Sequence, residues 1–406
     1  ATVIPTGSNT ANGNASASAH TLTGAGNFNA TITWPGRITW NNNTAPTLTY
    51  NSDASSSAAQ IFNFTTVDTG LTYNGWEGTN YNEDASYRLF YWGLNSNGAA
   101  GQDNNTPGYS SPVQISGTKW ATVDGLSGTS NWLGCIQRDG NTRNTLWTWG
   151  YNSDGCLGQG NQTALSSPTQ VGTGNDWALF ESNMKVGMAT KTDGTLWMWG
   201  YNNNGNLGQG DKVYQELAQN DRESLSSPVQ VPGSWKSVSG TYYNSFGVRT
   251  DGTLWSWGNN SHGSLGQNNQ TKYSSPNQIG TNTDWSHLAS TYMADFGGAI
   301  KTDGTLWLMG YNQRGELGQN EGDGGGTTRY SSPVQVPGSW QTCAFGDNHT
   351  MGLKTDGTMW VWGEGSHGTG LNNRTQYSSP VQIGTANDWT TGGAGQHNVY
   401  GTRLPT

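Results

Sequence analysis

Short runs of alternating apolar and polar residues, separated by turn residues, follow one another along most of the chain and predict β-strands. A typical pair of runs lies on either side of Asp193-Gly194, and Asp-Gly between two such runs is a strong hairpin signal. We interpret the turn as type I′, in which both central residues have positive φ and glycine avoids a Cβ clash. In the following strand Trp197 and Trp199 are two positions apart, so they share one face.

This pattern repeats along the chain. Thr-Asp-Gly-Thr-Leu-Trp is intact at 192–197, 250–255 and 302–307, recurs with Met at 355–360, and has a looser copy at 138–147. Each unit continues with Asn-x-x-Gly-x-Leu-Gly-Gln, a variable loop, a Ser-Ser-Pro-x-Gln strand and a leading tryptophan. The glycines that close the Trp-x-Trp-Gly stretches are spaced by 57, 50, 58, 52 and 53 residues: Gly93, Gly150, Gly200, Gly258, Gly310 and Gly363. The chain therefore holds six units of about fifty residues.

Most of the tryptophans belong to this repeat. Six lead the first strand of a unit, nine take full or partial Trp-x-Trp positions between Trp147 and Trp362, and Trp92 makes sixteen of the twenty. Because they recur at repeat positions, we interpret them as packing residues and not as a ligand cage.

The composition supports a packed β protein. Charged residues make up 11% of the chain, against roughly 25% in an average soluble domain, and Gly supplies 60 residues, so a helical protein is disfavoured. The 20 Trp and 17 Tyr supply more apolar area than a disordered chain would have. A net charge of −9 disfavours nucleic acid, and no apolar run is long enough to insert into a membrane. The three cysteines are too few for a disulfide framework and are expected to be free thiols.

The run Asp-Gly-Thr-Leu-Trp-x-Trp-Gly, followed by Asn-x-x-Gly-x-Leu-Gly, resembles the repeat of RCC1-like β-propellers over about residues 85–403. The resemblance implies an all-β fold in which four-stranded blades circle a central channel. The family usually has seven blades, and we find six copies of the repeat. We therefore expect a six-bladed propeller, with a seven-bladed one as the alternative.

The two ends of the repeat region complement each other. Residues 389–403 supply only the leading strands of a last unit, whereas 87–93 and 110–115 supply the remaining strands of a blade. Joining them would remove two exposed sheet edges. We therefore predict that residues 81–406 form one propeller, closed by its N- and C-terminal strands.

Residues 1–80 lack the repeat and predict a small β module. Its elements are a strand with Trp34 before a proline, a second tryptophan at Trp40, an Ala-Pro-Thr-Leu-Thr run at 45–49 and a Phe-x-Phe strand ending at Phe64. This order resembles a module common near the ends of bacteriophage tail-fibre proteins, which implies an oligomer, often a trimer. We expect Trp34, Trp40 and Phe64 to serve attachment or self-association. The chain begins with Ala1, so we also expect that an initiator or leader has been removed.

No catalytic motif stands out, because the sequence has no Gly-x-Ser-x-Gly, His-Glu-x-x-His, P-loop or dinucleotide fingerprint. The acidic loop at 320–326, with Glu321 and Asp323, has calcium-type ligands, but a solvated Gly-rich loop is the favoured interpretation. We therefore expect no enzyme activity, no catalytic residue, no metal and no cofactor. The repeated carboxylates are interpreted as turn formers: Asp193, Asp251, Asp303 and Asp356.

The segment 211–225 breaks the repeat most, since its fifteen residues hold six of the 45 charges of the chain. Two interpretations stay open. One is a solvated insertion. The other is a contact surface on the propeller rim that uses Tyr214, Glu216 and Arg222, because binding concentrates on variable loops of rigid scaffolds and aromatic and Arg side chains often anchor interfaces.

The leading functional hypothesis is a structural bacteriophage virion protein, namely a tail fibre, head fibre or capsid-decorating protein. It would lie at the particle surface, contact other virion proteins and display the propeller for binding to a host-surface glycan or protein. The alternative is a secreted bacterial RCC1-like propeller that binds or inhibits another protein. Nucleotide exchange on a small GTPase, implied only by the family resemblance, ranks last.

Overall fold

The computed structural model describes residues 21–23, 49–51, 88–117, 119–120, 126–128, 131–138, 144–210, 224–289, 295–321, 329–366, 369–394 and 398–403. The chain divides into two compact units, Ala1–Thr79 and Asn80–Thr406. Every helix or strand element in the described residues is a strand, which confirms the all-β prediction.

In the first unit the structure describes two short strands, β1 (Thr21–Thr23) and β2 (Thr49–Asn51), which pair in parallel. The three predicted attachment residues, Trp34, Trp40 and Phe64, lie outside the described residues. Attachment or self-association through this unit therefore stays a prediction.

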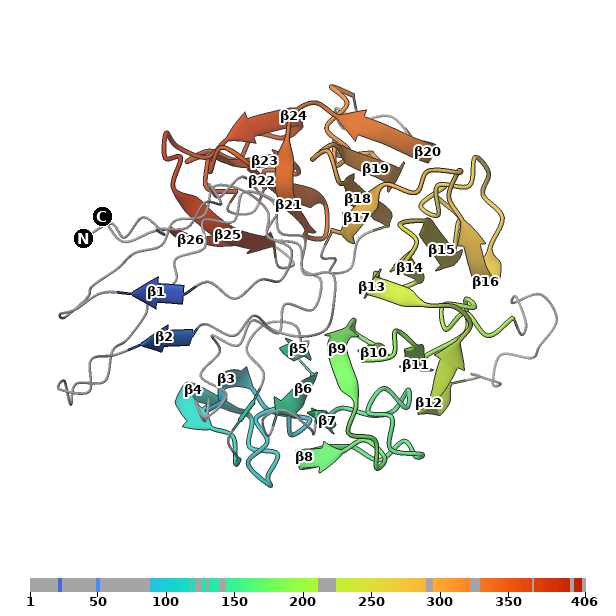
Figure 1. Cartoon of the computed structure of the whole chain (residues 1–406), viewed down its shortest axis with the longest axis vertical. Coiled ribbons are helices and arrows are strands. Elements are labelled where there is room, and N and C mark those ends of the chain that lie inside the picture. Colours follow the sequence, from blue (N-terminus) through green and yellow to red (C-terminus); the bar gives the residue numbers. More distant parts are fainter. Residues whose placement is uncertain are drawn as a thin grey trace. The chain divides into compact units, whose positions relative to one another are not determined.

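The second unit contains five four-stranded antiparallel sheets, each made of four consecutive strands (Figure 1). The first two sheets are β5 (Leu126–Gly128), β6 (Trp132–Arg138), β7 (Asn144–Gly150), β8 (Leu165–Gln170) and β9 (Trp177–Ser182), β10 (Val186–Lys191), β11 (Leu196–Gly200), β12 (Leu225–Val231). The next two are β13 (Trp235–Gly240), β14 (Asn244–Arg249), β15 (Leu254–Gly258), β16 (Tyr273–Gln278) and β17 (Trp285–Leu288), β18 (Phe296–Lys301), β19 (Leu306–Tyr311), β20 (Arg329–Val336). The fifth is β21 (Trp340–Phe345), β22 (His349–Lys354), β23 (Met359–Gly363), β24 (Tyr377–Gln382).

Two further sheets have two strands each. β3 (Phe90–Leu94) pairs with β4 (Gly108–Gln114), and β25 (Trp389–Ala394) pairs with β26 (Val399–Arg403). Their positions in the sequence repeat make β25 and β26 the first and second strands of a blade, and β3 and β4 the third and fourth. Among the described strands β26 has no hydrogen-bonded pairing with β3. The six blades, the alternative of seven and the closure of the ring therefore stay predictions.

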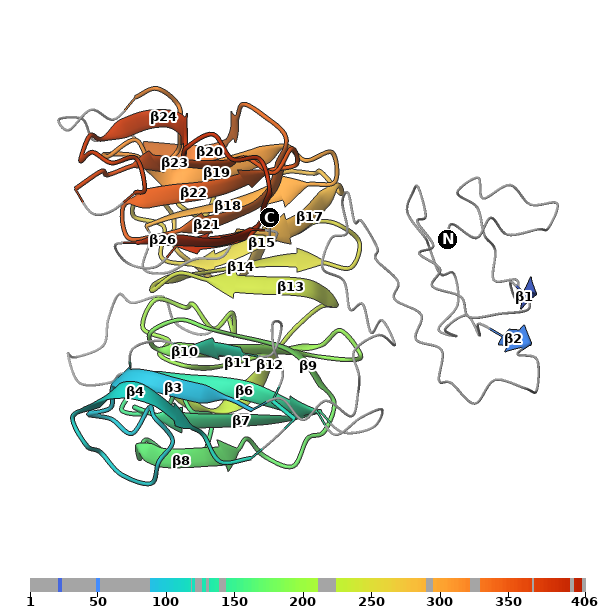
Figure 2. The same cartoon turned by 90° about the vertical axis from the view of Figure 1, so that its left-hand side faces the viewer.

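The sheets follow one another in chain order, and at most of the junctions between them the first strands are in contact. β5 contacts β9, β9 contacts β13, β13 contacts β17, and β21 contacts β25. In Figure 1 the first strands lie toward the middle and the fourth strands toward the outside, and Figure 2 shows the same sheets from the side. This is the arrangement of a β-propeller.

The predicted Asp-Gly hairpins are present, but the predicted turn type is wrong. In the β10–β11 hairpin Gly194 N donates to Lys191 O (2.9 Å) and only the glycine has positive φ, at 81°. Asp193 Oδ1 accepts hydrogen bonds from Thr195 N (2.9 Å) and Thr195 Oγ1 (2.7 Å). These bonds hold the aspartate in an ordinary backbone conformation. The loop is therefore of the three-residue class that ends on a left-handed glycine, and the aspartates are turn formers as predicted.

The tryptophans pack the sheets against one another, which confirms their predicted role. The leading tryptophans of the five complete sheets are buried: Trp120, Trp177, Trp235, Trp285 and Trp340. Four second tryptophans of the Trp-x-Trp pairs are also buried, and each donates its Nε1 proton to a backbone carbonyl of the preceding sheet's loop: Trp149 to Ala99, Trp199 to Cys156, Trp257 to Asn206 and Trp362 to Glu316. The cysteines are free and buried, as predicted.

Candidate binding face at the first hairpins

One end of the sheets carries polar side chains that differ from one repeat to the next. In an antiparallel four-stranded sheet the hairpin between strands one and two lies at the same end as the connection between strands three and four. We call this end the first-hairpin face. The connection between strands three and four contains a repeated asparagine, which holds the loop together. In the first complete sheet Asn152 Oδ1 accepts from Leu157 N (2.9 Å), and Asn152 Nδ2 donates to the carbonyls of Asn161 and Thr163. The residue before the turn glycine varies between repeats.

That variable residue reaches the first hairpin of the next sheet at three of the seams between sheets. Two of the three contacts join groups of opposite charge, the histidine when it is protonated. The pairs are Asn97 Nδ2 to Asn131 Oδ1 (3.3 Å), Lys185 Nζ to Asp154 Oδ2 (3.5 Å), and His262 Nδ1 to Asp295 Oδ2 (3.7 Å). Each of these three seams therefore has its own polar pair on a common framework.

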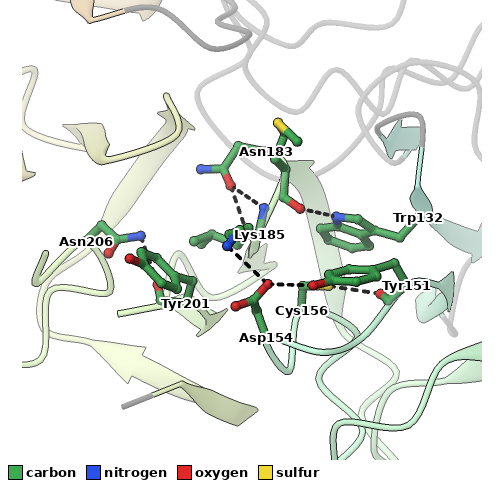
Figure 3. Close-up of polar contacts among 10 residues, drawn as sticks. Trp132, Tyr151, Asp154, Cys156, Asn183, Lys185, Tyr201 and Asn206 are labelled. Carbon is green, nitrogen blue, oxygen red and sulfur yellow. Dashed lines mark hydrogen bonds and ion pairs between the residues drawn. The ribbon is translucent and has the colours of Figure 1, made fainter. Parts of the chain in front are cut away.

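Among the ion pairs of the described residues, the most buried one lies at the seam between the β5–β8 and β9–β12 sheets. Asp154 is 2% exposed, and its Oδ2 accepts a hydrogen bond from the Tyr151 hydroxyl (3.2 Å) as well as facing Lys185 (Figure 3). Below it, Cys156 Sγ donates to Tyr151 O (3.1 Å). Burial raises the pKa of the Cys156 thiol, so this cysteine is not poised as a nucleophile.

Lys185 links this ion pair to an aromatic group on the next seam. Its Nζ lies 4.8 Å from the ring centroid of Tyr201 and 5.6 Å from that of Tyr242, and Tyr242 packs edge-on against Tyr243. Burial acts to lower the pKa of Lys185, but the Tyr242 hydroxyl, Asp154 and Tyr201 outweigh it, and the pKa is raised. The ammonium therefore stays charged at the edge of a tyrosine surface.

The seam between the β17–β20 and β21–β24 sheets is acidic. Glu364 accepts from Asn348 Nδ2 (2.9 Å) and lies 3.7 Å from the Arg314 guanidinium. Beside them Glu316 is fully buried, its Oε2 accepts from Arg314 N (2.8 Å), and its Oε1 has no hydrogen-bond partner in the described protein. Burial raises the pKa of Glu316 to about 7, so its carboxyl is partly protonated at neutral pH.

The residues predicted for recognition lie outside this geometry. Tyr214, Glu216 and Arg222 fall in 211–223, outside the described residues. That segment connects β11 to β12, so it starts and ends on the first-hairpin face. In the acidic loop at 320–326, Glu321 Oε2 accepts from the Tyr330 hydroxyl (2.6 Å), and Asp323 lies outside the described residues. No group of three or more His, Cys, Asp and Glu among the described residues could hold a metal ion.

Sequence reasoning missed the seam pairs. The variable position before the turn glycine was visible as a difference between repeats at Asp154 and His262. Their partners, Lys185 and Asp295, lie in first hairpins that share no motif, so only the folded neighbour relation identifies them.

The comparisons with known proteins agree with this geometry. The arrangement of sheets defines a repeat β-propeller. A model of the Regulator of chromosome condensation (RCC1) repeat matches residues 143–181, 193–246, 251–290 and 303–353, and a second model of that repeat matches 235–264 and 344–369. The propeller is therefore built from RCC1 repeats, as the sequence resemblance implied. The described residues contain no helix that could cross a membrane.

Relatives match over parts of their length. Human Protein RCC2 is 37% identical over 90 residues, which are 21% of this chain and 16% of RCC2. The Ultraviolet-B receptor UVR8 of Arabidopsis thaliana is 24% identical over 259 residues, 59% of this chain and 53% of UVR8. The chain thus spans about half or less of these relatives. The structure of Prp20p from Saccharomyces cerevisiae is similar with a TM-score of 0.64 and 19% identity, over 78% of this chain and 79% of Prp20p, which shows the fold.

Proposed function

We propose that this chain is a non-enzymatic binding protein whose propeller presents the first-hairpin face to a macromolecular partner. The contrast between repeated and variable residues on this face supports the proposal. Repeated asparagines and tryptophans hold the loops, whereas the seams differ in Asp154, Lys185, His262 and Asp295. Varied polar and aromatic side chains on a rigid framework are the usual basis of specific recognition.

The proposed setting is the surface of a bacteriophage particle, where the chain would act as a tail-fibre, head-fibre or capsid-decorating protein. The resemblance of about residues 20–78 to a tail-fibre module supports this setting. That module would contact other virion proteins and self-associate, with a trimer as the expected form. The propeller would face the host glycan or protein, and Tyr214, Glu216 and Arg222 lie in a connection that starts on the same face.

A protein-binding or inhibitory propeller outside a virion is the second candidate. The relatives favour it, because Prp20p has binding properties to Gsp1p and histones, and RCC2 and UVR8 are a human and a plant protein. For this chain we retain only the general mode, in which a propeller face contacts a protein.

Immunogold labelling of native particles with an antibody to this protein tests the setting, and adsorption competition tests the face. We expect labelling at a defined particle site and slower particle adsorption when purified full-length chain is added. Replacing Tyr242 and Tyr243 with alanine should abolish that competition. The matched control is Thr302→Ala, an exposed change at the opposite end of a sheet. Unlabelled particles would contradict the virion setting, and equal competition by both variants would contradict the face.

A further inference from the structure

A cavity of about 390 Å³ lies at the seam between the β13–β16 and β17–β20 sheets. Its volume is within the range of small-molecule sites, roughly 300–1,000 Å³. The third-to-fourth connection after β15, the linker from β16 to β17, and strands β17 to β20 all contribute to its walls. It uses none of the side chains named above for the first-hairpin face, although Gln267 and Asn268 belong to a connection that starts and ends on that face. The residues that matter are Gln267, Asn268, Asn282, Trp285, Lys301 and Trp307.

The floor of the cavity combines the partly exposed Trp307 indole with the Lys301 ammonium, whereas Trp285 is only 4% exposed. The Lys301 ammonium lies between two indoles, 5.0 Å from the Trp285 ring centroid and 5.3 Å from that of Trp307. Lys301 Nζ is also 3.2 Å from Asp284 Oδ1. Because this ion pair is compensated within the protein, it gives the cavity no net attraction for an ion.

The rim of the cavity is made of side-chain amides and a hydroxyl. Gln267 commits its Nε2 to Ser256 Oγ (3.2 Å) and Asn277 O (3.0 Å), so its carbonyl oxygen remains as an acceptor. Asn268 Oδ1 accepts from Ser332 Oγ (3.3 Å), so its amide hydrogens remain as donors. Asn282 is exposed and supplies both kinds of group.

The other described seams lack this combination. Asn268 has a φ of 56°, and at the equivalent position of two seams glycine takes the left-handed conformation, at Gly160 and Gly210. A six-residue linker, 279–284, joins the sheets here and bears Asn282, whereas the three residues Pro-Gly-Ser join them at 232–234 and 337–339. Among the described seams, an asparagine, the long linker and a complete following sheet occur together only here.

We infer that this cavity binds a neutral pyranose, as a monosaccharide or as one residue of a longer glycan. The C–H face of a pyranose matches the exposed part of the Trp307 indole, and its hydroxyl groups match a rim that offers donors and acceptors without charge. This inference names a ligand class for the propeller but does not depend on the virion setting.

Saturation-transfer NMR and calorimetry of the full-length chain test the inference, with glucose, galactose, mannose and N-acetylglucosamine as probes. We expect saturable binding of at least one of them. The double variant Asn268→Gly with Asn282→Ala should weaken that binding about tenfold or more, since two hydrogen-bonding side chains are lost. Its fold should persist, because equivalent positions of other seams carry Gly160, Gly174 and Ala386.

The matched control is Asn320→Gly, the same change at the next seam, which should leave the affinity unchanged. Asn282→Ala alone repeats the test with an exposed side chain that takes no part in packing. Absence of saturable binding for all four sugars would overturn the inference, as would an equal loss of affinity in the control. Sugar binding that survives in the Tyr242 and Tyr243 variant would separate this site from the first-hairpin face.

Discussion

The five complete sheets and the two half-sheets differ in how they use the same repeat positions. In four complete sheets the cation that ends the second strand lies over two tryptophan rings, the leading one and the first of the Trp-x-Trp pair: Lys191, Arg249, Lys301 and Lys354. In the β25–β26 half-sheet Arg403 lies over Trp389 and pairs with Asp388 (2.7 Å). The second ring would come from a third strand, and β3 carries Phe90 at that position, 46% exposed.

The second aromatic position shows the same difference. In a complete sheet, Trp362 is buried and packs against Gly318 of the preceding sheet. A Cβ atom on Gly318 would lie only 3.1 Å from Trp362 Nε1. On β3 the equivalent Trp92 is 62% exposed, and near Gly370, which corresponds to Gly318, the closest side chain is Ile383 of its own sheet. Each half-sheet thus presents what the other lacks. A blade of this protein is thus defined by its side-chain contacts, and we infer from these contacts that the two ends share one blade.

Of the changes that test a shared blade, deletion of residues 387–406 should have the largest effect on the stability of the protein. If the ends share a blade, the deletion leaves Phe90, Trp92 and Leu94 permanently without a partner strand. At about 1.5–3 kcal/mol for each large apolar side chain, the free energy of unfolding should fall by about 5 kcal/mol or more. Calorimetry and urea unfolding measure it. A deletion variant that melts like the full chain would show that the half-sheets are independent.

A disulfide tests the register of the shared blade. β22 and β23 pair with Met351 opposite Val361, and the equivalent residues on β26 and β3 are Tyr400 and Tyr91. Tyr91→Cys with Tyr400→Cys should therefore form an intramolecular disulfide and raise the melting temperature.

The positive control is Met351→Cys with Val361→Cys, and the register control is Tyr91→Cys with Thr402→Cys, which should cross-link poorly. Non-reducing electrophoresis distinguishes the outcomes. A cross-linked dimer would mean that the blade is completed by a second copy of the chain, and no cross-link would count against any shared blade.

Phe90→Ala compares the two regions at a single position. In a shared blade Phe90 covers Arg403 as Trp360 covers Lys354, whose Nζ is 3.7 Å from the Trp360 ring centroid. The change should then cost about 2–4 kcal/mol, in the range of buried aromatic truncations and similar to Trp360→Ala. For a half-sheet residue left at the surface the cost should stay below about 0.5 kcal/mol. Urea unfolding of the two variants side by side decides between these values.

The residues that the sequence could predict are those whose structure is local or periodic. Asp193-Gly194 marked a hairpin, Trp197 and Trp199 marked one strand face, and the repeat marked the order of the sheets. The turn type escaped because Thr195 donates two hydrogen bonds to Asp193, a side-chain contact that the Asp-Gly pair does not reveal. The pairs of Asp154 with Lys185 and of His262 with Asp295 join different repeats and have no sequence pattern.

Glu316 gives the smallest predicted effect and distinguishes one complete seam from the others. At the equivalent position the other repeats carry Ala99, Cys156, Asn206, Ser264 and Thr369, none of which holds a carboxyl. Because burial raises the pKa of Glu316 from 4.5 to about 7, the folded protein holds a proton that the unfolded chain has lost in this window. The stability from this group is therefore complete below pH 4.5 and is lost as pH rises through about 7.

Glu316→Gln keeps the shape of the side chain and removes its titration. As pH rises from 5 to 8, the free energy of unfolding of the variant should increase by about 1–3 kcal/mol relative to that of the parent, because only the parent then has to bury a carboxylate. Unfolding free energies measured across this pH range check the prediction. Glu364→Gln is the matched control, since that carboxylate is partly exposed and bonded to Asn348. Parallel pH profiles for the parent and Glu316→Gln would show that the buried carboxyl is already ionised at pH 5, and the seam would then resemble its neighbours in carrying no titrating group.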